Sequence, residues 1–155
     1  MRFLGNIMAK VDAKGRVFLP SAFRKILQIN DEENLILRKD AFVSCLTIYP
    51  ESVWNKHLDV LRARLSRWDA QEQQIFRQFV SDAELLTLDN NGRFLIPKRY
   101  LNMANIQQNV KFIGMDDTIE IWCSEATEKP FMGSEEFGAA LENMMNTAKD
   151  INKEA

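Results

Sequence analysis

The chain has 155 residues, 46% of them hydrophobic, which is enough to bury the core of one ordinary domain or of two very small ones. Its 22 acidic side chains nearly balance its 20 basic ones, so a strong overall positive field is excluded, and a nucleic acid would have to meet a local patch. The two isolated cysteines exclude a disulfide framework, and we expect neither a metal nor a cofactor.

The first predicted elements are two short apolar runs, "IMAKVD" (7 to 12) and "RVFLP" (16 to 20). Ile7, Ala9 and Val11 would share one face of a strand. Between the runs, Ala13-Lys14-Gly15 has the length and the glycine of a three-residue hairpin loop, in which glycine takes the left-handed conformation without steric cost. The sequence therefore predicts a strand, a tight turn and a second strand.

A short helix is predicted next. Pro20 lacks the N–H that a central strand needs but suits the first turn of a helix, and Phe23, Ile26 and Leu27 then recur at helical spacing. Two further strands, "NLILR" (34 to 38) and "LTIYP" (46 to 50), close a unit of about 45 residues. A unit of this size is marginal by itself.

Two helical segments follow, "ESVWNKHLDVLRARLSRW" (51 to 68) and "AQEQQIFRQFVSDAELL" (70 to 86). Each carries apolar residues on one face, which predicts packing between the parts of the chain or against another subunit. The two stripes are Trp54, Leu58, Leu61 and Leu65, then Ile75, Phe76, Phe79 and Val80.

The opening unit then recurs. "VDAKGRVFLPSAFR" (11 to 24) matches "LDNNGRFLIPKRYL" (88 to 101), so that Asp12, Gly15, Arg16 and Pro20 correspond to Asp89, Gly92, Arg93 and Pro97 at a constant offset of 77. "KFIGM" (111 to 115) and "IEIWC" (119 to 123) repeat the two closing strands. We therefore predict an α+β fold with two ββαββ modules that complete one core together, each followed by helical segments.

The predicted divisions are a first module at 6–53, a helical connector at 54–81, a second module at 82–125 and a tail at 126–155. The tail should form a helix with a frayed, partly disordered end. Its apolar face would comprise Phe137, Leu141, Met144, Met145 and Ala148.

Charge is distributed unevenly. Residues 1–30 contain six basic side chains against Asp12 alone, whereas residues 123–155 carry a net negative charge. The planar fork of Arg16 or Arg93 suits phosphate oxygens or a guanine edge, while the neighbouring Asp12 and Asp89 suit turn formation or the positioning of the arginine. A purely structural role for both loops remains open at this point.

Catalysis is not expected. His57, the one histidine, lies on the exposed side of a helical pattern, and Cys45 and Cys123 are isolated, so neither a nucleophile with its base nor a metal set is evident. No small-molecule substrate is evident either. Because the N-terminus lacks a signal-peptide pattern and no run of roughly 18 apolar residues occurs, we expect a cytoplasmic protein without a membrane partner.

With both copies in view, residues 1 to 125 resemble the MraZ family of SpoVT-AbrB transcriptional regulators. The resemblance rests on "FLGN", "DAKGRVFLPSAFR", "DNNGRFLIPKRYL" and "FIGMDDTIEIW". It implies that the modules interlock as a swapped-hairpin β-barrel, a double-psi-like pseudo-dimer, and that protomers form a ring-shaped homo-oligomer. It also implies nucleoid association and binding to repeated promoter boxes of double-stranded DNA, as an autorepressor of the division and cell-wall gene cluster.

The resemblance also assigns residues. Arg16 is the strongest candidate for DNA contact, and Lys14, Gly15 and Arg93 are the other candidates in the motif. The positive charge of residues 1–30 adds Lys10 and Arg24 as candidates. The structural positions of the motif are Asp12, Asp89, Gly92, Pro20 and Pro97. Whether the arginines meet bases or phosphates stays open. The alternative is an antitoxin-like protein-interaction module of the same superfamily.

Overall fold

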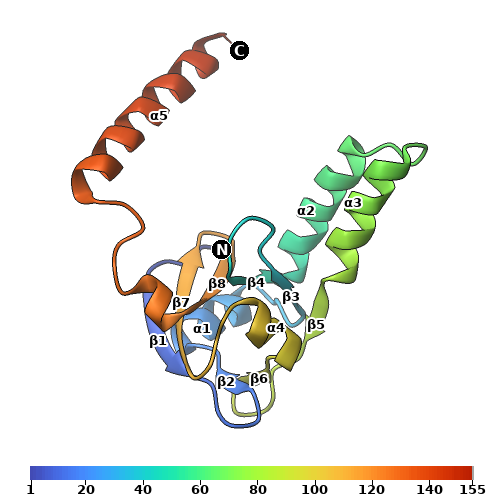
Figure 1. The fold of residues 1–155 in the computed structure, drawn as a ribbon, viewed down its shortest axis with the longest axis vertical. Coiled ribbons are helices and arrows are strands. Elements are labelled where there is room, and N and C mark those ends of the chain that lie inside the picture. Colours follow the sequence, from blue (N-terminus) through green and yellow to red (C-terminus); the bar gives the residue numbers. More distant parts are fainter. Residues whose placement is uncertain (155) are drawn as a thin grey trace.

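The computed structural model describes the backbone of residues 1–154 and the side chains of residues 1–147. Most strands form one antiparallel six-stranded sheet, in the order β1-β7-β8-β4-β3-β5, and a separate two-stranded ribbon lies at one end of it (Figure 1). The strands of the sheet are β1 (Asn6–Lys10), β7 (Asn109–Met115), β8 (Thr118–Cys123), β4 (Leu46–Pro50), β3 (Leu35–Lys39) and β5 (Glu84–Leu86). The ribbon pairs β2 (Arg16–Phe18) with β6 (Arg93–Leu95).

The sheet joins the two copies strand by strand. β1 of the first copy pairs with β7 of the second, β5 of the second pairs with β3 of the first, and β4 pairs with β8 at the centre. The order is therefore the same when the copies are exchanged. The predicted hairpin between residues 7–12 and 16–20 is correct in its turn but wrong in its pairing, because β1 and β2 each pair with the other copy.

Each copy contributes one short helix, α1 (Ser21–Ile29) or α4 (Lys98–Met103). Pro20 and Pro97 stand at the N-cap, one position earlier than predicted, where a missing N–H costs no helical hydrogen bond. Both helices end in a left-handed residue, Asp31 or Asn105, followed by an N–H that returns to the last helical turn. The local signals of the two copies thus produce the same helix ends.

One hydrophobic core receives side chains from both copies, as the marginal size of each module predicts. Phe3 meets the ring of Phe23 edge to face, with centroids 5.6 Å apart, and Phe94 meets Phe112 in the same way. The largest fully buried side chains are Tyr100, Phe3, Phe23, Phe112, Leu19, Leu35, Leu37, Leu46, Ile48, Ile96, Ile119 and Ile121.

The helices α2 (Glu51–Arg64) and α3 (Ala70–Ser81) form an antiparallel pair that extends away from the sheet (Figure 1). Its base is anchored where the Trp54 ring stacks on Phe79 at 5.3 Å. Arg38, a buried residue of β3, donates from Nε to the Phe79 carbonyl at 3.0 Å. The predicted first helix ends four residues early, at Arg64. The predicted second helical segment ends at Ser81, and its last three residues form β5 instead. The far end of the pair projects away from the sheet (Figure 1).

The tail begins with a short 3₁₀ turn, η1 (Ser124–Thr127), and continues as the predicted helix α5 (Ser134–Glu154). α5 forms a second arm that diverges from α2 and α3 (Figure 1). The predicted apolar residues Phe137, Leu141, Met144 and Met145 are exposed. Ala148 and the predicted disordered end lie outside the described side chains. Among the described residues, no helix is both long and apolar enough to cross a membrane.

Candidate nucleic-acid interface

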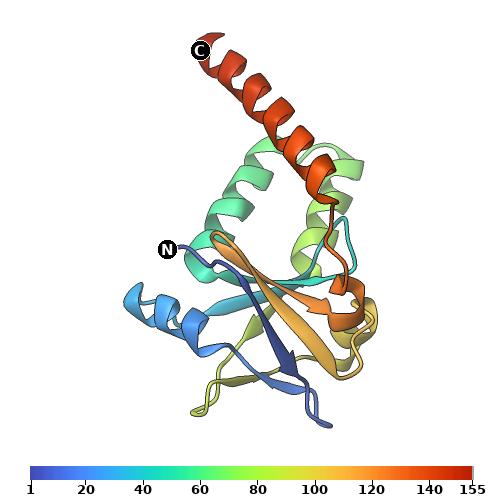
Figure 2. The same cartoon turned by 90° about the vertical axis from the view of Figure 1, so that its left-hand side faces the viewer.

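The two repeated loops, Asp12–Arg16 and Asp89–Arg93, lie together at one end of the molecule (lower end of Figure 2). They stand at the end opposite the two helical arms. Because β2 and β6 begin at the last residue of each loop and pair with each other, the ribbon fixes the distance between the two loops. The fold therefore brings the two copies of the sequence motif onto one surface.

Each loop is closed by its aspartate in the same way. Asp12 Oδ1 accepts the backbone N–H of Lys14 and of Arg16, both at 2.9 Å. Asp89 Oδ1 accepts those of Asn91 at 2.8 Å and Arg93 at 2.9 Å. The glycine of each loop has positive φ, as predicted. The aspartate and glycine thus account for the shape of the turn without the arginine side chain.

The arginine is held through one nitrogen. Nε of Arg16 donates to Asp12 Oδ2 at 2.9 Å, and Nε of Arg93 donates to Asp89 Oδ2 at the same distance. Within the described part of the chain, no terminal guanidinium nitrogen of either arginine donates a hydrogen bond. The pair therefore orients each guanidinium and leaves its outer edge available to a polyanion.

The carboxylates are stabilised in their charged form. The hydrogen bond from the backbone N–H of Arg16 is the largest cause that lowers the pKa of Asp12, with further contributions from the Arg16 side chain and the Lys14 N–H. The backbone N–H of Arg93 lowers the pKa of Asp89 in the same way. Both loops should hold their shape throughout the neutral range.

The outer face of the ribbon connects the two arginines. Arg16 lies opposite Leu95 and Phe18 lies opposite Arg93, while Val17 and Phe94 point into the core. The Arg93 guanidinium is 5.7 Å from the centre of the Phe18 ring. Phe18 and Leu95 are more than half exposed and were not among the predicted site residues. The sequence did contain a signal for them. Side chains alternate between the two faces of a strand, so burial of Val17 and Phe94 puts Phe18 and Leu95 on the outer face.

Each loop also accepts a backbone hydrogen bond from the other copy. The Gly15 carbonyl accepts the Ile96 N–H at 2.8 Å, and the Gly92 carbonyl accepts the Leu19 N–H at 2.9 Å. Arg24, a predicted DNA contact, is half-buried: its Nε donates to the Leu19 carbonyl at 3.0 Å. A Cβ at Gly92 would approach the Arg24 guanidinium carbon to 2.7 Å. Arg24 therefore lies against the second loop.

The remaining predicted cations flank the first loop. Lys14 is exposed at its tip, and Lys10 is exposed at the end of β1, two residues before Asp12. The second loop carries Asn91 in place of Lys14. Leu101 of the second copy corresponds to Arg24 of the first. A Cβ added at Gly15 would lie 3.8 Å from Cδ1 of Leu101. The first loop consequently carries more positive charge than the second.

A group of side chains of the types that bind metals lies away from the loops, at the ends of β3 and β4 and in β8. Ligand atoms of Asp40, Cys45 and Glu120 lie within 4.8 Å of one another. Burial, reinforced by the charges of Glu120 and Asp40, raises the pKa of Cys45 to about 12. The thiol is therefore protonated near neutral pH, and a metal would have to displace that proton.

Comparison with known proteins relates both copies of the repeat to one family. The profile of a family described as "MraZ protein, putative antitoxin-like" matches residues 3–78 and again residues 79–146. The Transcriptional regulator MraZ of Phocaeicola vulgatus is 61% identical over 151 residues, covering 97% of this chain and 98% of its own. The same-named protein of Bacteroides thetaiotaomicron is 62% identical and covers 94% of each chain. That of an Anaeromyxobacter species is 34% identical, covering 81% of this chain and 86% of its own.

Proposed function

Because this chain belongs to the MraZ family of transcriptional regulators, we propose that it acts by binding double-stranded DNA through the end of the molecule that carries the two repeated loops. The predicted resemblance to this family is confirmed over both copies.

A single observation carries this proposal: two arginines, oriented by identical Nε–carboxylate bonds, share the outer face of one ribbon. A structural role would be fulfilled by the aspartate and glycine alone, since they make the hydrogen bonds that shape the turn. Orienting a guanidinium while leaving its outer edge unpaired favours contact with phosphates or guanine edges.

The other residues take secondary roles in this proposal. Lys14 and Lys10 add positive charge beside Arg16 and contact the phosphate backbone. Gly15 shapes the first loop, since its φ is positive and an added Cβ would meet the Ile96 carbonyl of the second copy. Arg24 acts as a positioning residue, since its guanidinium lies against Gly92 and its Nε is bonded to the Leu19 carbonyl.

We further propose that the cross-copy strand pairing closes as a swapped-hairpin barrel and that protomers assemble into a ring. A surface with few cations binds DNA weakly and with strong salt dependence, so several copies on repeated promoter boxes would supply avidity. Autorepression of the division and cell-wall gene cluster, in the cytoplasm at the nucleoid, completes the proposal.

The decisive experiment is electrophoretic mobility with DNA from the gene's own upstream region. Arg16→Ala should abolish specific binding, and Arg93→Ala should weaken it, with size-exclusion behaviour unchanged. Arg99→Ala is the matched control, because Arg99 lies on α4 and not on the ribbon. Its guanidinium donates to the Glu84 carboxylate and the Tyr100 hydroxyl. Specific binding that survives Arg16→Ala would contradict the proposal.

The antitoxin-like reading is the second candidate, because the matching family's description contains that term. In that case a protein partner would bind the exposed apolar side of α5. DNA binding by the isolated chain that is lost in Arg16→Ala and kept in Leu141→Ala would decide for the DNA-binding function.

A further inference from the structure

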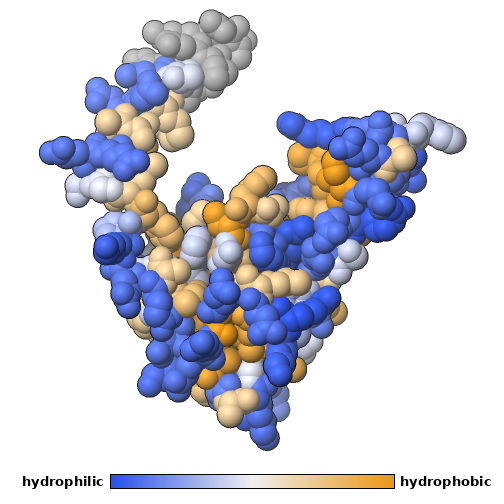
Figure 3. Space-filling model, viewed as in Figure 1, coloured by the Kyte–Doolittle hydropathy of each residue, from blue (hydrophilic) through white to orange (hydrophobic). Residues whose placement is uncertain are grey.

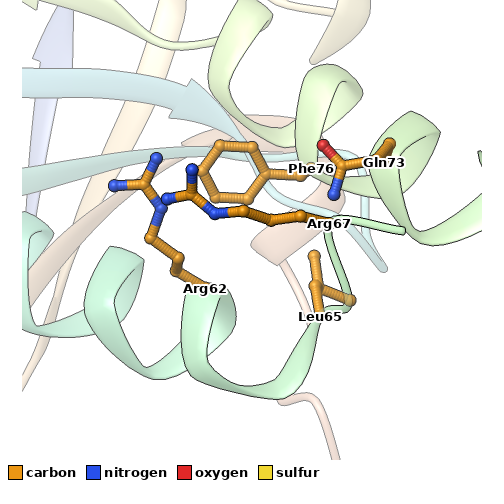
Figure 4. A pocket seen from close by; sticks show the side chains of 5 residues that line it. All are labelled: Arg62, Leu65, Arg67, Gln73 and Phe76. Carbon is orange, nitrogen blue, oxygen red and sulfur yellow. The ribbon is translucent and has the colours of Figure 1, made fainter. Parts of the chain in front are cut away.

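The far end of the α2–α3 pair holds a pocket of about 300 Å³ that the proposed function does not use. It is lined by Arg62, Leu65, Arg67, Gln73 and Phe76. Figure 4 shows the guanidinium groups of Arg62 and Arg67 side by side, next to the ring of Phe76. Arg62 comes from the last turn of α2, Arg67 from the connection, and Phe76 from α3. The pocket thus combines two cations with an apolar floor.

The two cations have no counter-charge of their own. Among the described side chains, no carboxylate lies within ion-pair distance of Arg62 or Arg67. The Arg62 guanidinium carbon lies 5.5 Å from the centre of the Phe76 ring. Two adjacent like charges repel each other, so an anionic group placed between them would be stabilised, and Leu65 and Phe76 would accept an apolar neighbour beside it.

α5 offers the complementary surface. Its residues Phe137, Leu141, Met144 and Met145 are each at least 42% exposed and follow one another at helical spacing. Residues 134–147 contain three glutamates and neither lysine nor arginine, and helical spacing puts Glu136 and Glu142 on opposite sides of the apolar stripe. Figure 3 shows apolar side chains along α5 and on the α2–α3 arm. An apolar stripe bordered by carboxylates matches an apolar floor bordered by guanidinium groups.

The two surfaces do not meet within one chain. In the described residues α5 makes no sizeable set of contacts with α2 or α3, and the two arms diverge (Figure 1). In the first copy, α2 and α3 come after the last strand, β4. In the second copy, α5 comes after the last strand, β8, so the two arms occupy corresponding positions in the repeat. A second copy of the chain, offering the same two surfaces, can satisfy both at once.

We propose that α5 of one copy docks on the Arg62–Arg67 pocket of another copy. Its apolar stripe packs against Leu65 and Phe76, and Glu136 or Glu142 lies between the two guanidinium groups. This inference rests on the self-assembly in the proposed function but is independent of DNA contact. It names a pair of surfaces that would join neighbouring protomers.

The test uses two charge-reversed versions of the full chain. One carries Arg62→Glu and Arg67→Glu, and the other carries Glu136→Arg and Glu142→Arg. Each version should associate with itself about tenfold or more weakly than wild type in analytical ultracentrifugation without DNA, because each presents like charges at the contact. Mixing the two versions should restore assembly, since the acidic α5 of the first then meets the basic pocket of the second.

The mixture distinguishes contact between copies from contact within one chain, because folding of α5 onto its own pocket would give no restoration. Arg64→Glu with Arg77→Glu is the matched control, since both arginines lie on the same helices outside the pocket lining, and it should leave association unchanged. Circular dichroism should show native helix content in every version.

Each other outcome has a definite meaning. Loss of association in the arginine version alone would indicate a different anionic occupant and overturn the inference. Assembly equal to wild type in both versions would overturn it as well, while leaving ring formation intact. A wild-type chain that is monomeric at every concentration would overturn this inference and the proposed ring together, and the mobility experiment would still test DNA binding separately.

Discussion

Arg24 of the first copy lies across Gly92, the turn glycine of the second copy. A Cβ on Gly92 would be 2.7 Å from the Arg24 guanidinium carbon and 2.9 Å from its Cδ, while Arg24 Nε is bonded to the Leu19 carbonyl. The second loop is therefore supported by a residue 68 positions earlier in the sequence, from the other module.

This relationship predicts the effect of Gly92→Ala. The substitution combines a left-handed φ of +82° with displacement of Arg24, so it should lower the free energy of unfolding by about 1–3 kcal/mol. Gly5→Ala is the matched control: Gly5 has φ of +84° but no atom within 4 Å of an added Cβ, so backbone strain alone should cost roughly 1 kcal/mol. Urea unfolding of both variants measures the difference. Equal losses would show that Arg24 moves aside freely.

The aspartates should control how well the arginines bind DNA. Asp12→Ala removes the acceptor of two backbone N–H groups and of Arg16 Nε, so Arg16 would lose its fixed orientation. We expect DNA affinity to fall about tenfold, although a negative charge has been removed from the interface. Titration of labelled promoter DNA at fixed salt gives the affinity. Tighter binding in Asp12→Ala would show that charge outweighs orientation at this site.

Stability at acid pH should depend on the same two carboxylates. Because the folded state lowers the pKa of Asp12 and Asp89 below 3.8, their contribution is fully present above that value and is lost as the pH falls through the lowered folded values. The stability difference between wild type and the double variant Asp12→Asn, Asp89→Asn should therefore be constant near neutrality and shrink below about pH 4. Thermal unfolding across this range tests it. A difference independent of pH would contradict the shift.

The two cysteines should differ in reactivity. Cys45 is fully buried and its pKa is raised to about 12, so it should resist alkylation at mildly alkaline pH until the chain unfolds. Cys123 is half-buried at the end of β8, with Sγ 2.9 Å from Glu125, and should react first although burial also raises the pKa of its thiol. Mass spectrometry after timed iodoacetamide treatment separates the two sites. Rapid native labelling of Cys45 would show that this part of the sheet opens.

The sequence predicted the local features because their causes are local. Gly15 and Gly92 take left-handed φ since an Asp three residues earlier closes the turn, and Pro20 and Pro97 begin a helix wherever the chain leaves a strand. The alignment at an offset of 77 transferred each feature from one copy to the other. The family followed from the same residues and is confirmed over both copies.

Part of the site could not be predicted in this way. The position of Arg24 is one example, because nothing in its own helix indicates that Gly92 leaves the space into which its guanidinium fits. Phe18 and Leu95 appeared as ordinary strand residues, and only the pairing of β2 with β6 puts them between the two arginines. Such relationships join residues that are far apart in the chain.

By itself, therefore, the sequence determined the turns, the helix starts and most of the strand segments, each of which depends on residues within a few positions of one another, and it also showed the duplication. Strand β5 was missed, because residues 84–86 continue the apolar pattern of the preceding helix. The tertiary structure decided which strands pair. Because the two copies carry nearly the same apolar pattern, each strand has equally suitable partners in its own module and in the other one, and local preferences do not distinguish them. Burial of one common core selects the cross-copy pairs β1–β7, β3–β5 and β2–β6, and that selection brings Arg16 and Arg93 onto a single surface.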